Sequence, residues 1–341
     1  MRETILQNFE DCTSETKLIS DLIYGICDSR KVSSGALSGY ISGEAKVESK
    51  QRKIERYLQK GMNDESVIWR ATQKILSPKK VDLSFDRTNW KYGLVHVNAF
   101  VAFASDGKVG GVVNVKMLDN NGGNSKSIDR IKMAKEVIDR QGKENINCIL
   151  GDREFFSIEF AHWLTSNDVP FVIRLRENLE FIQPYLKKAT KLKTITKRVE
   201  TVNEYGVVSK IDLTIKVLKD EYLILASNKV KQPLSKYKKR WEIERFFRML
   251  KTGGFNLEDS KVTIPARIKI IFMLCSLAYL ICATIGYYRY VKIEKMRWKK
   301  KDRCFEYSYF RWGLDWIKEL IILGNERLYS LVSKALPGLQ L

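Results

Sequence analysis

The chain has 341 residues, 44% of them apolar, which predicts a sizeable core divided over two or three domains. Its 60 Lys and Arg against 40 Asp and Glu give a net charge of +20, which predicts a polyanionic partner. DNA or RNA is the first choice and an anionic membrane surface the second. The alternative is a basic surface that is only solvated. Two histidines are too few for a nuclease built on a His cluster, and six scattered cysteines without a C-x-x-C pair argue against a zinc module or a disulfide framework and suit a reducing cytosol.

The first segment, to about Leu76, predicts helices. It begins with MRETILQNFED, which is polar and mixed in charge, so no secretory signal is expected. Apolar residues recur at helical spacing in Lys17–Cys27 and again in Val67–Leu76. Pro78 marks a plausible boundary, so we expect a small all-α N-terminal domain over residues 1–78.

A basic segment lies between these two helices. A small-residue stretch, SSGALSGYISGEA, precedes KVESKQRKIERYLQK, which places Arg52, Lys53 and Arg56 on a predicted helix. A basic helix after a turn can enter a DNA groove, but the same residues can also form a solvated face. We predict that these three residues bind DNA and that the N-terminal domain is a DNA-binding domain, with the solvated face as the open alternative.

From Val81 the apolar period shortens to two residues, which indicates strands. VDLSFDRTNW predicts a strand that ends at Asp86, while VHVNAFVAFAS and GGVVNVKML predict two more, joined by a hairpin at Asp106-Gly107. SKSIDRIKMAKEVIDRQG then predicts a helix, INCILGDREF a short buried strand, IEFAHWLTSND a helix and PFVIRLREN a strand. The order β-β-β-α-β-α-β is the ribonuclease-H-like plan, a mixed α/β sheet with flanking helices.

A β-rich insertion over about residues 180–234 interrupts this plan. Alternation in TITKRVETV, SKIDLTIKVL and EYLILAS predicts its strands. Helical spacing resumes at Ser235 and runs to Lys251. We therefore expect one ribonuclease-H-like domain over residues 79–290 that contains the insertion.

The stretch Ile268–Gly286, IKIIFMLCSLAYLICATIG, approaches the length of a membrane span. It contains Lys269 and follows a charged helix, so we expect a buried core helix, with a transmembrane helix as the alternative. Beyond it, the basic and aromatic run YYRYVKIEKMRWKKKDR and an amphipathic helix around Trp312–Leu323 predict a basic, helical C-terminal region over residues 291–341.

The helix YKKRWEIERFFRMLK carries a pattern typical of phosphate chemistry. At about 100° per residue, Tyr237, Arg240, Glu244 and Lys251 fall within an arc of roughly 60°, beside an apolar arc that would pack on the sheet. A carboxylate flanked by cations is what a site handling phosphate and metal together needs. Spacing alone also fits an amphipathic helix with incidental surface ion pairs.

Two aspartates strengthen the functional interpretation. Asp86 ends a predicted central strand, with Asp82 as a less favoured neighbour, and Asp152 closes the apolar strand INCILG before a charged turn. Each alone is more often a cap or turn residue. With Glu244 on a helix beside them, they can share two divalent ions, Mg²⁺ or alternatively Mn²⁺, that activate an attacking hydroxyl and stabilise the leaving oxygen.

The chain resembles the insertion-sequence family 4 transposases of the DDE class. The resemblance lies in DRTNW at Asp86, GDREF at Asp152, the Y-x-x-R-x-x-x-E-x-x-x-x-x-x-K pattern from Tyr237 to Lys251, and the GGFNLEDS that follows. It extends from Gln51 to about Gly286. The first two motifs alone are weak, but together with the spaced Tyr-Arg-Glu-Lys set, in this order, they are highly specific.

The resemblance implies cut-and-paste DNA transposition, in which a nicked end passes through a hairpin before it attacks target DNA. It implies Asp86, Asp152 and Glu244 as catalytic metal ligands, and Tyr237, Arg240 and Lys251 as phosphate contacts. It also implies that the N-terminal helices read terminal inverted repeats of double-stranded DNA. Catalysis is expected in a homodimer that pairs two ends, in a cytoplasmic, nucleoid-associated protein with no membrane partner.

This sequence departs from hairpin-forming relatives in one respect. Relatives that form hairpins stack a flipped base on an aromatic side chain, often a Trp in the insertion, and this insertion has none. The remaining candidates are Phe181, Tyr185, Tyr205 and Tyr222, each of which can instead pack the sheet. Six basic residues of the insertion are expected to contact DNA backbone, with a solvated face as the alternative; they are Lys187, Lys188, Lys191, Lys193, Lys197 and Arg198.

Two other functions compete with an active transposase. One is a catalytically silent, transposase-derived DNA-binding protein, against which the intact acidic triad argues. The other is a ribonuclease-H-like structure-specific nuclease such as a junction resolvase, which would cut DNA without joining it to a second molecule.

Overall fold

A computed structural model of the chain describes residues 2–6, 9, 11–62, 65–76, 80–92, 95–118, 125–203, 205–219, 221–260, 262–301, 304–323, 330 and 334–336. Within these residues, eight strands form one mixed sheet in the order β3-β2-β1-β4-β5-β8-β7-β6. The strands are β1 Val81–Tyr92, β2 Val95–Ser105, β3 Gly110–Met117, β4 Ile146–Gly151, β5 Phe171–Arg174, β6 Thr194–Val202, β7 Val208–Val217 and β8 Tyr222–Asn228. The mixed α/β sheet with flanking helices confirms the predicted fold class.

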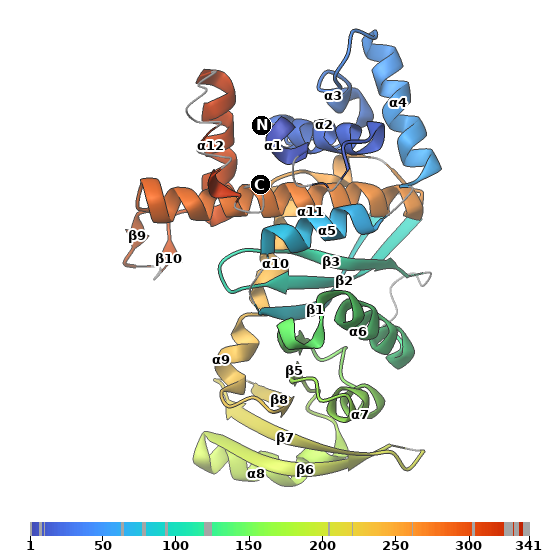
Figure 1. Cartoon of the computed structure of the whole chain (residues 1–341). Helices are drawn as coiled ribbons and strands as arrows, with labels where there is room; N and C mark the ends of the chain where they lie inside the picture. Colours follow the sequence, from blue (N-terminus) through green and yellow to red (C-terminus); the bar gives the residue numbers. More distant parts are fainter. Residues whose placement is uncertain are drawn as a thin grey trace.

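Helices flank the sheet, and α11 lies across its β3 end (Figure 1). Those before the sheet are α1 Arg2–Leu6, α2 Ser14–Ser29, α3 Ser34–Ser38, α4 Val47–Lys60 and α5 Ser66–Leu76. Those within and after it are α6 Ser127–Gln141, α7 Ile158–Ser166, α8 Gln183–Leu192, α9 Pro233–Lys238, α10 Trp241–Arg248, α11 Pro265–Tyr288 and α12 Tyr309–Leu323. Pro78, the predicted domain boundary, lies outside the described residues.

The strand β1 is longer than predicted. It does not end at Asp86 but continues to Tyr92, because the antiparallel hairpin with β2 pairs it along its whole length, down to Tyr92 and Val95. Its parallel pairing with β4 does stop at Phe85. Asp86 is therefore the first residue of β1 that does not pair with β4, although it still pairs with β2.

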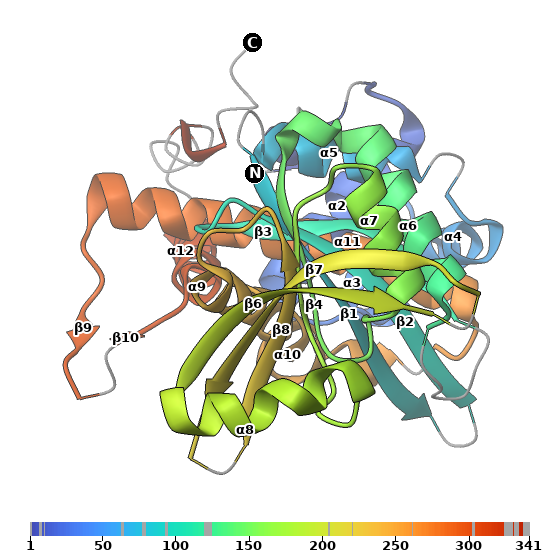
Figure 2. The same ribbon diagram turned by 90° about the horizontal axis from the view of Figure 1, so that it is seen from below.

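The predicted insertion extends the main sheet. β8 pairs antiparallel with β5, and β7 and β6 follow outward, so the insertion strands continue the sheet (Figure 2). The helix α8, Gln183–Leu192, lies against β6 and β7. The sequence analysis predicted only strands in this insertion and missed the helix. Pro184 lies in the first turn of α8, a position at which proline favours helix initiation.

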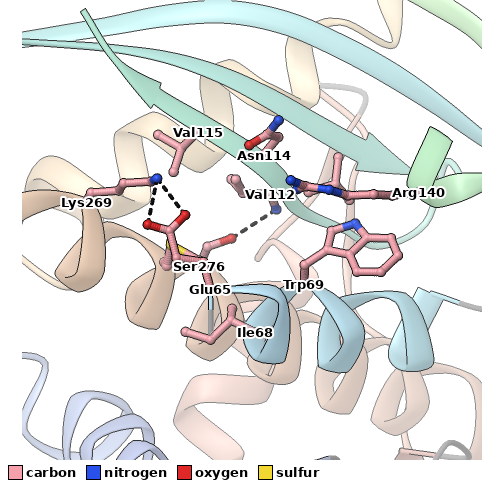
Figure 3. A pocket seen from close by; sticks show the side chains of 11 residues that line it. Glu65, Ile68, Trp69, Val112, Asn114, Val115, Arg140, Lys269 and Ser276 are labelled. Carbon is pink, nitrogen blue, oxygen red and sulfur yellow. Dashed lines mark hydrogen bonds and ion pairs between the residues drawn. The ribbon is translucent and has the colours of Figure 1, made fainter. Parts of the chain in front are cut away.

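The long apolar helix α11 belongs to the core. It is long and apolar enough to cross a membrane by composition, yet 83% of its most apolar stretch is buried within the protein. It packs on β3, α2, α5 and α12. At the contact with β3, the Ser276 hydroxyl accepts a hydrogen bond from the Val112 amide at 3.0 Å, and Lys269 pairs with Glu65 at 2.6 Å (Figure 3). These contacts agree with the predicted core helix.

The crossing of α11 and α12 depends on two glycines. A Cβ at Gly313 would lie 1.9 Å from the Cys282 carbonyl oxygen, and one at Gly286 would lie 1.8 Å from the Tyr309 carbonyl oxygen. Gly313→Ala should therefore force the helices apart and destabilise the fold by at least about 1–3 kcal/mol.

Thermal unfolding of Gly313→Ala against Gly39→Ala tests this expectation. A Cβ at Gly39 would meet nothing within 4 Å, and the residue has an ordinary helical φ of −65°. Equal unfolding temperatures for the two variants would contradict the close crossing.

Candidate active site

The end of the central parallel strand pair brings two predicted ligands to one level of the sheet. The last paired residues of β1 and β4 are Phe85 and Gly151. Asp86 and Asp152 each follow this pair directly, Asp152 after the carboxyl end of β4 and Asp86 within β1, where β4 no longer pairs with it. Open α/β sheets place their ligands at this edge, so the two carboxylates occupy a suitable position for a shared site.

The helix predicted from Ser235 to Lys251 is broken, and the prediction of one continuous helix is wrong. α9 ends at Lys238, and α10 begins at Trp241 after a tight turn in which the Arg240 amide donates to the Tyr237 carbonyl at 3.0 Å. Met249–Gly253 then forms a π-helical turn. Periodicity does not reveal this turn, because Lys239 and Arg240 keep helical backbone angles through it.

Arg240 is the centre of the site. Its side chain is only 10% exposed, its Nη1 donates to Asp86 Oδ2 at 2.9 Å, and its Nη2 donates to Glu244 Oε1. Its guanidinium carbon lies 5.6 Å from the centre of the Tyr237 ring. Among the described residues, the buried Nε of Arg240 has no acceptor. The carboxylates thus use two of the five guanidinium N–H groups, and others remain for an acceptor such as a phosphate oxygen.

Tyr237 connects the same helical segment to the second aspartate. Its hydroxyl donates to Asp152 Oδ1 at 3.2 Å. Burial raises the pKa of Tyr237 to about 12, with Asp152 adding to the effect and Arg240 opposing it, so the phenol remains a protonated donor at neutral pH. Two side chains of the α9–α10 segment, Tyr237 and Arg240, therefore contact all three predicted carboxylates.

The Asp86 carboxyl has a perturbed pKa. Burial raises this pKa to about 6, while Arg240 and the backbone amide of Arg87, which donates at 2.8 Å, lower it; Asp152 and Glu154 raise it further. A buried carboxylate of raised pKa beside other acids is typical of a functional site.

The three carboxylates fit a hard divalent cation by their chemistry. Oxygen ligands are those that Mg²⁺ and Mn²⁺ prefer, and Asp86 and Glu244 already share one positive group, the Arg240 guanidinium. Within the part of the chain that the structure describes, no three Asp, Glu, His or Cys side chains lie close enough to hold one ion. The donor set thus fits a metal site, in which a cation would take over part of the role of Arg240.

Four predicted site residues lie outside this cluster. Lys251 donates to the Asn89 carbonyl of β1 at 2.7 Å, and burial lowers its pKa. Arg52, Lys53 and Arg56 are exposed on α4, at the end of the molecule away from β6 (Figure 1). Arg52 and Arg56 line a shallow groove along that helix. The structure thus gathers the other five predicted residues and leaves these four apart.

An ion pair that the sequence analysis missed connects the two aspartate motifs. Arg87 Nε lies 2.5 Å from Glu154 Oε1, and Arg87 Nη2 donates to Oε2 at 2.8 Å. Arg87 follows Asp86 and Glu154 lies two residues after Asp152, so this bidentate pair holds the two carboxylate-bearing segments together. Both motifs, DRTNW and GDREF, contain an Asp-Arg pair, and this repetition is the sequence signal that could have revealed the contact.

Asp82, the less favoured neighbour of Asp86 in the sequence analysis, pairs with lysines. It is buried on β1 and pairs with two lysines of the α9 segment, Lys236 at 2.5 Å and Lys239 at 3.1 Å. These ion pairs fix α9 against the sheet, so they position Tyr237 and Arg240 over the carboxylates.

The chain matches a known protein family over most of its length. The family model described as "Transposase DDE domain" matches residues 69–281, which include both strand ends and the α9–α10 segment. No curated protein sequence matches the chain.

Two solved structures show only distant similarity. A piggyBac transposase synaptic complex with hairpin DNA, solved by cryo-EM, has a TM-score of 0.44 and 9% identity over 99% of this chain and 83% of that chain. The NurA nuclease from Sulfolobus solfataricus has a TM-score of 0.28 and 10% identity over 57% of this chain and 82% of that chain. Similarity at this level carries no inference about this chain.

Proposed function

The chain belongs to the transposase DDE domain family, and from this premise we propose that it cuts the ends of a mobile DNA element and joins them to target DNA by a cut-and-paste route, in the manner of insertion-sequence family 4 transposases. The observation that carries the proposal is the contact of Arg240 with Asp86 and Glu244, with Tyr237 holding Asp152 beside them. Two of the three carboxylates thereby pair with one buried cation, and the third lies beside them on the hydroxyl of Tyr237.

Asp86, Asp152 and Glu244 would hold the divalent cations, Mg²⁺ or Mn²⁺, with two ions per site. When bound, such ions activate an attacking oxygen and neutralise the charge of the leaving one. The chain's own residues position the DNA. Arg240 would offer backbone phosphate the guanidinium N–H groups that Asp86 and Glu244 leave unused. The single O–H of Tyr237 would become available to a phosphate once a metal ion takes Asp152, and Lys251 would extend the positive charge beyond them.

Other parts of the chain would bind more distant DNA. We assign terminal inverted repeats to α4 with Arg52, Lys53 and Arg56, since these side chains are exposed on one helix. The basic residues of α8 and β6 would contact backbone phosphates. A homodimer would pair two ends, the ends would pass through hairpins, and the protein would act in the cytoplasm on the nucleoid.

Strand joining tests the proposal most directly. The protein is incubated with candidate terminal DNA and a target plasmid, with and without Mg²⁺, and joined molecules are detected by primer extension across the junction. Joined product that requires Mg²⁺ is the expected result. Its absence under conditions of demonstrated end binding would overturn the active-transposase proposal.

The products also separate the two competing functions. Binding to end DNA without any Mg²⁺-dependent nick would support a silent DNA-binding protein. Cuts without transfer to the target plasmid would support a structure-specific nuclease.

The raised pKa of Asp86, about 6, predicts a pH dependence. Because protons and metal ions compete for one carboxylate, we expect the apparent metal affinity in cleavage to fall about tenfold per pH unit below 6 and to level off above it. The protonated form is favoured in the folded state, so this group's stabilising contribution is complete below pH 4 and is lost as the pH rises through 6.

Metal titrations of end cleavage at pH 5, 6 and 7 measure this dependence, with metal-free end binding at the same pH values as the control. An apparent metal affinity that is constant from pH 5 to 7 would contradict the role of Asp86 as a ligand.

A further inference from the structure

The strand β6, Thr194–Val202, is the last strand of the eight-stranded sheet and the lowest one in Figure 1. Among the described residues, β7 is the only strand that pairs with it, so its outer edge is open. The pairing with β7 runs along the whole strand without a bulge, and β6 contains no proline. It therefore has neither of these two common protections of an edge, and such an edge can accept a further strand.

Every second residue of β6 directs its backbone groups to this open edge. In an antiparallel pair, alternate residues bond to the partner strand and the residues between them point away from it. Just beyond β6, the Asn203 amide donates to the Val207 carbonyl at 3.1 Å in the same register. The odd-numbered residues of β6 therefore bond to β7, and the amides and carbonyls of the even-numbered ones, including Thr196, Arg198 and Glu200, point outward.

Two of these outward residues carry opposite charges on one face of the sheet. Arg198 pairs with Asp212 of β7 at 2.9 Å. Glu200 pairs with Lys210 of β7, also at 2.9 Å. Arg198 and Glu200 nevertheless remain 52% and 61% exposed, so each can meet a second opposite charge from beyond the edge. The edge is thus complementary in charge to an antiparallel copy of itself.

We propose that β6 pairs antiparallel with β6 of a second copy of the chain, around a two-fold axis at Val199. In this register Arg198 of each copy lies opposite Glu200 of the other, and the outward backbone groups of the two strands bond to one another. Each ion pair between β6 and β7 is then extended by an opposite charge from the other copy, so the charges alternate in sign across the joined sheets.

The charges select this register over its neighbours. An axis at Arg198 would set two arginines opposite each other, and an axis at Glu200 would set two glutamates opposite each other. Like charges directly opposite are unfavourable in a sheet. With the axis at Val199, the remaining charge of the strand, Lys197, lies opposite Thr201. No like charges then face each other directly.

This contact goes beyond the proposed function, because it forms between free protein chains and needs no DNA. Three strands, β5, β8 and β7, separate β6 from β4, the strand that precedes Asp152. The contact therefore leaves the carboxylates open, and end cleavage does not depend on it.

Sedimentation velocity of the DNA-free full chain over a concentration series tests the proposal. The native chain should pass from monomer to dimer as the concentration rises. Arg198→Glu sets acids opposite acids and Glu200→Arg sets bases opposite bases, in each case at two symmetry-related positions. Each variant should therefore dimerise at least about 10-fold more weakly. An equimolar mixture of the two variants should restore the dimer, because one chain then carries only acids on this edge and the other only bases.

Two further variants complete the series. Lys216→Glu is the matched control for charge reversal, because Lys216 is exposed on β7, one strand inward from the edge, and it should leave the dimer unchanged. Thr196→Pro removes an outward amide that β7 does not use. It should weaken the dimer while the monomer still unfolds cooperatively on heating.

A native chain that stays monomeric at every concentration would overturn the proposal. A dimer that neither charge reversal weakens would assign self-association to another surface, and a mixture that fails to restore the dimer would exclude the paired charges. Strand joining is measured separately, with DNA present. A charge-dependent dimer without joined product would keep the edge contact and remove the transposase proposal, and joined product from a chain without this dimer would do the reverse.

Discussion

Replacing Glu244 with Gln is expected to reduce metal-dependent cleavage of end DNA by at least about 100-fold while DNA binding remains. Glu244 is the only predicted ligand on a helix, and its carboxylate shares Arg240 with Asp86. Gln keeps the shape of the side chain but removes the charge and one oxygen that a divalent ion requires. Mutations of residues that only orient a ligand cost 10–100-fold, so the loss of a ligand should exceed that range.

Cleavage of labelled terminal DNA over a series of Mg²⁺ concentrations measures this effect, with gel-shift binding in parallel. Glu200→Gln is the matched control, because Glu200 is 61% exposed on β6 in an exposed ion pair with Lys210. Near-native cleavage by Glu244→Gln would exclude Glu244 as a ligand. A parallel loss of binding and of thermal stability would instead indicate a structural role.

Local periodicity predicted most of the fold. The alternation from Val81 and the helical spacing of Ser127–Gln141 are set by which face each element buries, and that information lies within a few residues of sequence. The extension of β1 beyond Asp86 was missed because its partner, β2, comes from the following segment. The pairing of β8 with β5, which joins the insertion to the sheet, also depends on a partner distant in sequence.

The sequence predicted the acidic residues of the candidate site but not the ion pairs that hold them in place. Asp86, Asp152 and Glu244 follow from strand ends, helix spacing and motifs. The contact of Arg240 with Asp86 joins segments 154 residues apart, and that of Arg87 with Glu154 joins segments 67 residues apart. No periodicity encodes such pairs, because they form only after the strands and α10 have packed.

Removing the Arg240 cation is expected to have the largest effect on stability. Arg240→Met leaves Asp86 and Glu244 near each other, largely buried and without their common positive partner, since these side chains are 18% and 27% exposed. Removing one member of a buried ion pair costs about 3–5 kcal/mol. Because a divalent cation can neutralise the same two carboxylates, Mg²⁺ should restore part of this loss and should stabilise the variant more than the parent.

Urea unfolding with and without Mg²⁺ measures both effects, and Arg198→Met is the matched control. Arg198 is 52% exposed and pairs with Asp212 across β6 and β7, so its loss should cost no more than about 1 kcal/mol and should be insensitive to Mg²⁺. Equal Mg²⁺ stabilisation of parent and Arg240→Met would show that the guanidinium and the metal do not share these carboxylates. Greater stabilisation of the variant would mean that Arg240 holds Asp86 and Glu244 together until a metal ion binds. This role would explain how the protein folds with these carboxylates close together in the absence of metal.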